Sequence, residues 1–235
     1  MLDEDNKHLY SRHLLIPGFD SACQEKLLNA KVLVVGAGGL GAPVLLYLTA
    51  AGIGSIVVVE DDKVARHNLQ RQILYKWEEV DEDKIDKATI RVKELNPECK
   101  ITKHKTRWSS NNAYEIAKDC DVIVDCTDNY ESRLLTDEVS VELKIPFVYG
   151  AINNWEGQVA VFNYNGGKKY TDTFNLGNCA DSSKNPVGVI GVLPGVTGSM
   201  QAAEVIKIIS GQGEVLSDKL LVFSLKHNSY NVLNL

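Results

Sequence analysis

A glycine-rich segment is the first feature of the chain with a defined chemistry. Gly36, Gly38 and Gly41 follow the apolar run 31–35 with the spacing Gly-x-Gly-x-x-Gly, and a helix-forming run comes next. Glycines at this spacing let backbone amides approach a phosphate at the positive end of a helix. Glu60 ends the next apolar run, 22 residues after Gly38, where a carboxylate can accept hydrogen bonds from ribose hydroxyls. These residues predict a nucleotide site, but the glycines alone do not distinguish NAD(P) from ATP.

Polar and charged residues follow two further predicted strands. Asn68-Leu-Gln-Arg-Gln72 comes after the strand 55–59, Lys84 opens the next helix, and Asp125-Cys-Thr-Asp-Asn129 comes at the end of the strand 121–125. Ligands of an open α/β sheet bind at the carboxyl ends of its strands. Cations there can neutralise the charge that grows on an α-phosphate and on departing pyrophosphate, and an aspartate can hold Mg²⁺. The combination favours a reaction at a triphosphate over hydride transfer.

Alternating strands and helices must position these residues. We predict strands at 31–35, 55–59, 100–104, 121–125, 146–149 and 157–164, followed by two short closing strands. We predict helices at 40–51, 84–95, 111–118, 131–143 and 197–210, and one that ends near Asn29. This order predicts an α/β fold: a Rossmann-like, mostly parallel twisted sheet with helices on both faces and an antiparallel C-terminal extension.

The domain organisation follows from the same pattern. We expect a single domain over residues 1–235, with a nucleotide-binding half at 8–150 and the antiparallel extension at 151–235. Residues from about 165 to 187 are polar and show little periodicity, so we expect a long crossover loop there.

Composition and charge exclude other classes of protein. Lys and Arg total 25 against 31 Asp and Glu, a formal net charge of −6, which argues against a nucleic-acid partner. Lys103, Lys105 and Arg107 alternate, and we interpret them as the solvated face of a strand. Val32 to Val59 contains no charged residue, but glycines and a proline divide it, so no membrane partner is expected. The polar N-terminus and an odd number of cysteines predict a cytoplasmic protein with reduced thiols.

Together these features resemble a known family, the ubiquitin-activating-enzyme-like adenylyltransferases of the MoeB/ThiF/HesA group. The resemblance extends from about Tyr10 to Ser210. It is carried by the segment Tyr10 to Ile16, the glycine loop, Asn68 to Gln72, Lys84, Asp128 and the stretch Gly188 to Gly195. It implies ATP-dependent adenylation of the C-terminal glycine of a ubiquitin-like sulfur-carrier protein ending in Gly-Gly. The carrier would serve the thiamine-thiazole or the molybdopterin pathway, and pyrophosphate would be released.

The resemblance also implies roles for individual residues. Arg71, Lys84 and Asn68 would contact the phosphates, Asp128 would organise Mg²⁺, and Arg12 would reach the active site of the other subunit of a homodimer. The implied nucleotide-binding residues are Gly36, Gly38, Gly39, Gly41, Glu60, Asp62, Asn68, Arg71, Gln72, Lys84, Asp128 and Asn129. The implied catalytic residues are Arg12, Arg71, Lys84, Asp128 and Cys179.

The sequence departs from the family pattern at three places. Glu60 stands where the family usually has aspartate, and Asp62 is an alternative partner for the ribose. The two Cys-x-x-Cys pairs that bind zinc in many members are absent, so we expect no zinc, and this leans slightly toward the thiazole branch. The loop before Gly188 has extra residues between Cys179 and Gly188. Cys179 itself resembles, in position, a loop cysteine that some relatives link covalently to the activated carrier, and the alternative is a spectator thiol.

Two other functions remain open at this stage. One is an NAD(P)-binding oxidoreductase that uses the same glycine loop, and NADH binding would distinguish it from ATP–pyrophosphate exchange. The other is a catalytically silent scaffold for a ubiquitin-like tail. The presence of Arg71, Lys84 and Asp128 argues against the scaffold.

Overall fold

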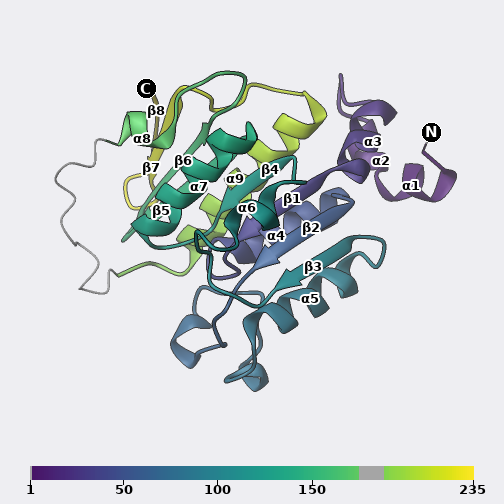
Figure 1. Ribbon diagram of the computed structural model, residues 1–235. Coiled ribbons are helices and arrows are strands. Elements are labelled where there is room, and N and C mark those ends of the chain that lie inside the picture. Colours follow the sequence, from purple (N-terminus) through teal and green to yellow (C-terminus); the bar gives the residue numbers. More distant parts are fainter. Residues whose placement is uncertain (1, 175–187) are drawn as a thin grey trace.

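Figure 1 shows the computed structural model of the protein, which describes residues 2–174 and 188–235. The strands are β1 (Lys31–Val35), β2 (Ser55–Val59), β3 (Lys100–His104), β4 (Val122–Asp125), β5 (Phe147–Asn153), β6 (Glu156–Phe162), β7 (Lys219–Ser224) and β8 (Ser229–Asn234). The α-helices are α1 (Glu4–Leu9), α2 (Ser11–Leu14), α3 (Ser21–Asn29), α4 (Gly41–Ala51), α5 (Lys84–Leu95), α6 (Ala113–Ala117), α7 (Tyr130–Leu143), α8 (Tyr170–Thr173) and α9 (Val192–Ser210). Two short 3₁₀ turns, η1 (Arg66–Asn68) and η2 (Trp77–Glu79), lie between β2 and α5.

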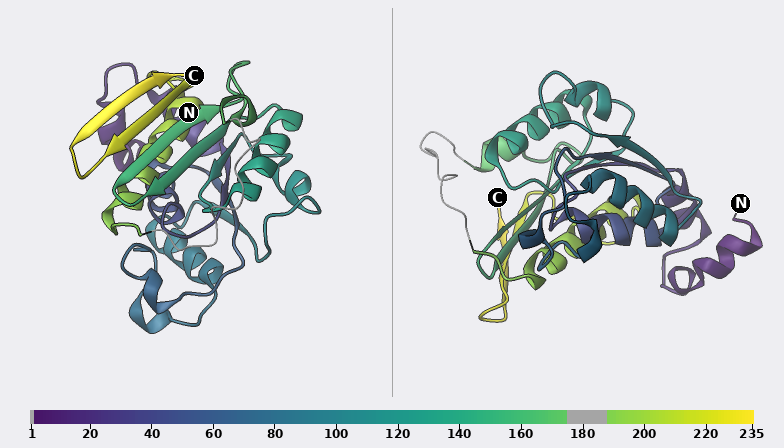
Figure 2. Two further views of the ribbon diagram at one scale, coloured as in Figure 1. Left: turned by 90° about the vertical axis from the view of Figure 1, so that its left-hand side faces the viewer. Right: turned by 90° about the horizontal axis from the view of Figure 1, so that it is seen from below.

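Within the described residues the strands form one sheet in the order β3-β2-β1-β4-β5-β6-β7-β8. Strands β1 to β5 pair in parallel, and β6, β7 and β8 are added in antiparallel register. Figure 2 shows the two C-terminal strands, in yellow, at the edge of the sheet opposite β3. The predicted fold class, a mostly parallel sheet with an antiparallel extension, is confirmed.

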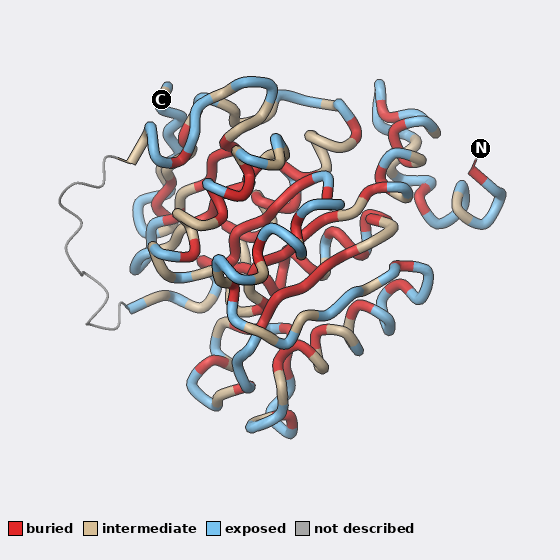
Figure 3. The backbone as a smooth tube through the Cα atoms, in the orientation of Figure 1, coloured by how far each residue is buried: buried red, intermediate tan, exposed pale blue. Residues whose placement is uncertain are grey.

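Helices cover both faces of the parallel part. Val32 and Val34 of β1 are buried with side chains of α3, α4, α5 and α9, whereas Leu33 and Val35 are buried with side chains of α6 and α7. A strand enclosed on both faces has no polar side, which explains the uninterrupted apolar runs in the sequence. Figure 3 shows the buried residues concentrated along these central strands.

The order of the strands creates a crevice at their carboxyl ends. Strand β1 lies between β2 and β4, and it is here that the strand order reverses direction along the sheet. The chain leaves β1 into α4 on one face and leaves β4 into α7 on the other. Open α/β sheets bind their ligands at such a reversal of strand order, because the two departing loops move apart there.

The structure differs from the predicted elements in several places: α1 and the two 3₁₀ turns were not predicted, and β5 continues to Asn153. Helix α9 begins at Val192 rather than near Thr197. Pro194 and Gly195 lie in the first turns of this helix. The backbone N–H groups of a first turn have no partner within the helix, so a proline there, which lacks an N–H, loses no helical hydrogen bond. The short helix α8 lies within the predicted crossover loop, and residues 175–187 of that loop lie outside the described residues.

The charge-free segment from Val32 to Val59 folds as β1, α4 and β2, as predicted. Its helix ends at Gly52, which has a φ of 89°, a left-handed conformation suited to glycine. Across residues 2–174 and 188–235, no helix has both the length and the apolar character that crossing a bilayer requires.

The turn between α4 and β2 provides a test of this packing. A Cβ atom on Gly54 would overlap the carbonyl oxygen of Leu28. Among the described residues, a Cβ on Gly195 in α9 would meet no atom within 4 Å outside its chain neighbours and its own helix backbone. We expect Gly54→Ala to lower the free energy of unfolding by at least about 2 kcal/mol, because backbone must move to admit the methyl group. Gly195→Ala should leave the stability unchanged or raise it by up to about 1 kcal/mol, since alanine is the better helix former.

Urea denaturation of both variants would measure these changes. Equal stabilities of Gly54→Ala and the parent chain would contradict the packing described at this turn.

Candidate active site

A cleft of about 720 Å³ opens at the carboxyl ends of β1, β2 and β4. It brings together most of the residues that the sequence predicts for nucleotide binding. They are Gly36, Gly38, Gly39, Glu60, Asp62, Asn68, Arg71, Gln72, Lys84, Asp128 and Asn129.

The glycine turn forms one wall of the cleft. Gly36 has a φ of 93°, and a Cβ on it would lie 2.9 Å from the carbonyl oxygen of Cys126 at the end of β4. A Cβ on Gly41 would overlap the carbonyl oxygen of Gly36, so this glycine serves the turn by packing rather than by lining the cleft. The N-cap residue of α4, Leu40, makes no side-chain cap hydrogen bond, so the positive end of this helix is suited to an anionic ligand.

Glu60 is bound to the backbone through both carboxylate oxygens. Its Oε2 accepts a hydrogen bond of 2.9 Å from the N–H of Ala37, and its Oε1 accepts from the N–H groups of Asp61 and Asp62, each at 2.9 Å. Glu60 therefore fixes the glycine turn to the end of β2. Oε1 uses both of its lone pairs in these bonds, but Oε2 accepts only one N–H, so the geometry still permits a bond from a ribose hydroxyl to Oε2.

Lys84 is a buried cation at the edge of the cleft. Its side chain is 4% exposed, and its Nζ lies 2.8 Å from Oδ2 of Asp62, whose side chain is 69% exposed. The backbone N–H of Lys84 also donates to the carbonyl oxygen of Asp62 at 3.0 Å, which fixes the start of α5 against the chain after β2. Arg71 is half-buried, and its Nη1 donates to the carbonyl oxygen of His67 at 3.3 Å.

Two buried amide side chains accompany these cations. Asn68 is 8% exposed and Gln72 is 5% exposed. The Nε2 of Gln72 would lie 3.3 Å from a Cβ on Gly38, so the amide faces the glycine turn. The Oε1 of Gln72 is buried and has no hydrogen-bond partner among the residues that the structure describes. A buried unpaired acceptor next to a cleft is suited to a ligand that brings a donor.

Asp128 is exposed in the loop after β4, and Asn129 next to it uses its Oδ1 to cap α7 through the N–H of Ser132, at 2.9 Å. One carboxylate is a sufficient protein ligand for Mg²⁺ where substrate phosphates supply further oxygens. In the described part of the chain, the one group of three metal-ligating side chains close together is Glu60, Asp61 and Asp62. Two of its members are exposed, and Asp128 does not belong to it.

A buried ion pair supports the loop that carries Asp128. Asp125 is fully buried, and its Oδ2 accepts from Nε of Arg133 at 3.3 Å. Its Oδ1 accepts from the N–H and the hydroxyl of Thr127, at 3.1 and 2.6 Å. Arg133 also donates to the carbonyl oxygen of Thr127 at 3.2 Å. Burial raises the pKa of Asp125, and the Arg133 guanidinium and the Thr127 hydrogen bonds oppose this rise.

Some predicted residues lie elsewhere. Arg12 is exposed on α2 and is absent from the described residues that line the cleft of its own chain. Cys179 lies outside the described residues.

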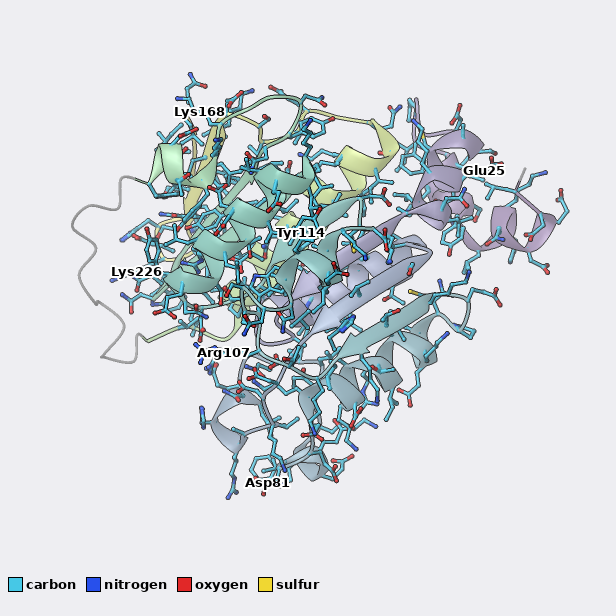
Figure 4. All side chains as sticks on the ribbon, in the orientation of Figure 1. Glu25, Asp81, Arg107, Tyr114, Lys168 and Lys226 are labelled. Carbon is cyan, nitrogen blue, oxygen red and sulfur yellow. The ribbon has the colours of Figure 1, made fainter. Side chains whose placement is uncertain are left out.

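The sequence analysis also missed two cations that line the cleft, Lys63 and Arg107. Arg107, labelled in Figure 4, is exposed and lines the cleft. It lies beyond the end of β3, so its predicted placement on the strand is wrong, whereas its predicted exposure is confirmed. The signal available in the sequence was its place just after a strand, which is also the place of Asn68 and Asp128.

Comparison with models of protein families identifies the family of the chain. The model of the ThiF family matches residues 10–235. The chain belongs to the ThiF family. This confirms the resemblance to the MoeB/ThiF group that the glycine turn, the Asn68 to Gln72 segment and Lys84 indicated.

Curated relatives of this ThiF chain are named as adenylyltransferases. A "Probable molybdopterin-synthase adenylyltransferase" of Porphyra purpurea is 44% identical over 219 residues, which are 92% of this chain and 57% of the relative. A "Sulfur carrier protein adenylyltransferase" of Thermus thermophilus is 41% identical over 236 residues, which are 95% of this chain and 85% of the relative. The chain thus spans less than two thirds of the algal relative's length.

Solved structures show the same fold at lower identity. A crystal structure of Escherichia coli MccB, with MccA-N7isoASN, superposes with a TM-score of 0.88 at 21% identity. The match covers 97% of this chain and 71% of MccB. It supports the fold of the ThiF chain.

The Asp125–Arg133 pair can be tested by removing its cation. Arg133→Met should lower the free energy of unfolding by about 3–5 kcal/mol at pH 7, because a buried carboxylate loses its charged partner. Without the guanidinium, burial raises the pKa of Asp125 further. The folded variant then binds a proton before the unfolded chain does, so its deficit relative to the parent should shrink as pH falls from 7 to 5.

Denaturant titrations at both pH values would measure this deficit. Lys118→Met is the matched control, since Lys118 forms an exposed pair with Glu115 on α6, and its deficit should stay within about 0.5 kcal/mol. A deficit of Arg133→Met that is independent of pH would contradict the charge argument.

Proposed function

We propose that this ThiF-family chain adenylates the C-terminal glycine of a ubiquitin-like sulfur-carrier protein with ATP and releases pyrophosphate. The observation that carries the proposal is the meeting of the glycine turn, Arg71, Lys84 and Asp128 in one cleft. The names of the curated relatives support the reaction class and the carrier class.

The charges of the cleft suit a reaction between two anions. The carboxylate of the carrier attacks the α-phosphorus of ATP, and the bond from that phosphorus to the bridging oxygen of the β-phosphate breaks. Since both partners are negative, cations must lie where they meet. Arg71, Lys84, Arg107 and Arg133 all line the cleft, in a chain whose formal net charge is −6.

Positioning and electrostatics can carry this reaction without a general base. A C-terminal carboxylate has an ordinary pKa well below 7 and is already ionised. In this proposal the glycine turn and the N-terminus of α4 bind the phosphates, Glu60 and Asp62 lie at the ribose end, and Asn68, Gln72 and Asn129 complete the polar lining. Arg71 and Lys84 stabilise the charge that develops on the leaving pyrophosphate.

Asp128 is the residue that we expect to hold Mg²⁺ together with phosphate oxygens. The exposed position of its carboxylate in the cleft fits such a ligand. When bound, Mg²⁺ would neutralise charge on the phosphate oxygens. The absence of zinc remains a prediction, and so does the cytoplasmic location.

The names of the relatives, and not the geometry of the cleft, support the class of carrier in this proposal. The algal relative is named for molybdopterin synthase and the bacterial one for a sulfur carrier, so the names give no support to the slight lean toward the thiazole branch. A covalent role of Cys179 also remains a prediction, because that residue lies outside the described residues.

We further propose a homodimer in which Arg12 acts in the partner's active site. Arg12 is exposed on α2, and Leu9, Leu15 and Ile16 around it are each more than half exposed. Exposed apolar side chains around a cation are typical of an interface between subunits. A dimer that covers these side chains would place Arg12 away from its own cleft and close to another chain.

ATP–pyrophosphate exchange in the presence of a sulfur carrier ending in Gly-Gly tests the chemistry. Lys84→Ala should reduce the exchange rate at least about 100-fold, because one cation directed at developing charge is removed. Carrier binding, measured by calorimetry, should be retained. Lys118→Ala on α6 is the control and should exchange at the parent rate.

The other functions predict different results. An NAD(P)-dependent oxidoreductase would bind NADH and show no exchange. A silent scaffold would bind the carrier and show no exchange in the parent chain either.

Mixing two inactive variants tests the role of Arg12 in the partner subunit. Arg12→Ala and Lys84→Ala homodimers should each be inactive, but a hybrid dimer has one site with an intact Lys84 and an intact partner Arg12. Re-equilibrated equimolar mixtures should therefore recover about a quarter of the parent exchange rate, as expected for random pairing of a two-fold dimer. Mixtures that stay inactive, although mass spectrometry detects hybrids, would exclude this arrangement.

A further inference from the structure

The peptide groups on both sides of Ala37 are held by side chains from two other segments. The N–H of Ala37 donates to Oε2 of Glu60 at 2.9 Å. The carbonyl oxygen of Ala37 accepts from the hydroxyl of Tyr75 at 2.6 Å. Ala37 is the residue between the first two glycines of the turn, so these bonds act directly on the turn that would face the phosphates.

The bond from Tyr75 fixes the orientation of the next peptide group. In a trans peptide the C=O and the following N–H lie in one plane and point in opposite directions. The carbonyl of Ala37 points at Tyr75, so the N–H of Gly38 points away from Tyr75. Gly38 lines the cleft, whereas Tyr75 is buried and is not among the residues that line it. The N–H of Gly38 is therefore directed to the cleft side of the turn.

Tyr75 belongs to the segment that also carries the predicted phosphate contacts. Its backbone N–H donates to the carbonyl oxygen of Gln72 at 3.2 Å, and Gln72 and Arg71 both line the cleft. Burial raises the pKa of Tyr75, so its hydroxyl remains a donor throughout the neutral and mildly alkaline range. The segment after β2 and the glycine turn after β1 are thereby joined by a hydrogen bond between residues 38 positions apart.

We propose that Tyr75 is a positioning residue for phosphate binding, which holds the Ala37–Gly38 peptide with its N–H toward the phosphates of ATP. The inference rests on the proposed function. Without the hydroxyl this peptide can rotate, because Gly38 has no Cβ to restrict it. A rotated peptide presents a carbonyl oxygen to the phosphates, which repels them.

Tyr75→Phe removes the hydroxyl and keeps the ring. The probes are ATP and adenosine, each measured with Mg²⁺ by displacement of a fluorescent ATP analogue from the full-length chain. We expect the affinity for ATP to fall about threefold to tenfold, the effect of one uncharged hydrogen bond. The affinity for adenosine should be unchanged, since adenosine has no phosphates. The ratio of the two affinities is insensitive to partial unfolding, which would lower both signals together.

Tyr149→Phe is the matched control. Tyr149 is equally buried, and its hydroxyl donates to Oε1 of Gln158 at 3.2 Å, outside the residues that line the cleft. Its ratio should equal that of the parent chain, and thermal unfolding should show both variants folded.

The outcomes separate this inference from the proposed function. An unchanged ratio in Tyr75→Phe, or an equal loss for ATP and adenosine, would overturn the positioning role while leaving ATP binding by the parent intact. A parent chain that fails to bind ATP would overturn the proposed function, and the positioning role with it.

Discussion

The close approach of backbone at the turn between β1 and α4 is the constraint on which the site depends. Gly41 packs against the carbonyl oxygen of Gly36, and Gly36 packs against the end of β4 with no room for a side chain. The turn can be this tight only with glycine at both positions. It brings the N-terminus of α4 and the ends of β1 and β4 to one place, and the cleft lies there.

Besides the ion pairs of Lys84 and Arg133, hydrogen bonds to the backbone of neighbouring segments fix the residues around the cleft. Glu60 accepts three backbone N–H groups, Asn129 caps α7, and Gln201 of α9 donates to the carbonyl oxygen of Asp125 at 2.7 Å. Hydrogen bonds of this kind orient charges before a ligand arrives. Preorganised charges stabilise a transition state without reorganising during the reaction, which is what a reaction between two anions requires.

Much of this arrangement could be predicted from the sequence, because local patterns determine it. The apolar runs of β1 and β2 and the glycine spacing are local, and the two strands form where they were predicted, beside the cleft. The predicted start of α9, near Thr197, was too late: the helix begins at Val192, and its first turn tolerates Pro194. The bond between Tyr75 and Ala37 had no local signal, because it joins two loops that meet only after the sheet has formed.

The pair formed by Lys84 and Asp62 can keep a buried cation neutralised while the cleft is empty. Lys84 is almost completely buried, so leaving its ammonium group without a partner would be costly. Asp62 is largely exposed, so water can solvate its carboxylate if the lysine turns away. Replacing Asp62 by a phosphate as the partner of Lys84 therefore costs little free energy for the released carboxylate. The same buried cation can remain paired in the empty cleft and be available to a triphosphate. This asymmetry of exposure arises because Lys84 is the first residue of α5, whereas Asp62 lies in the loop that faces the solvent.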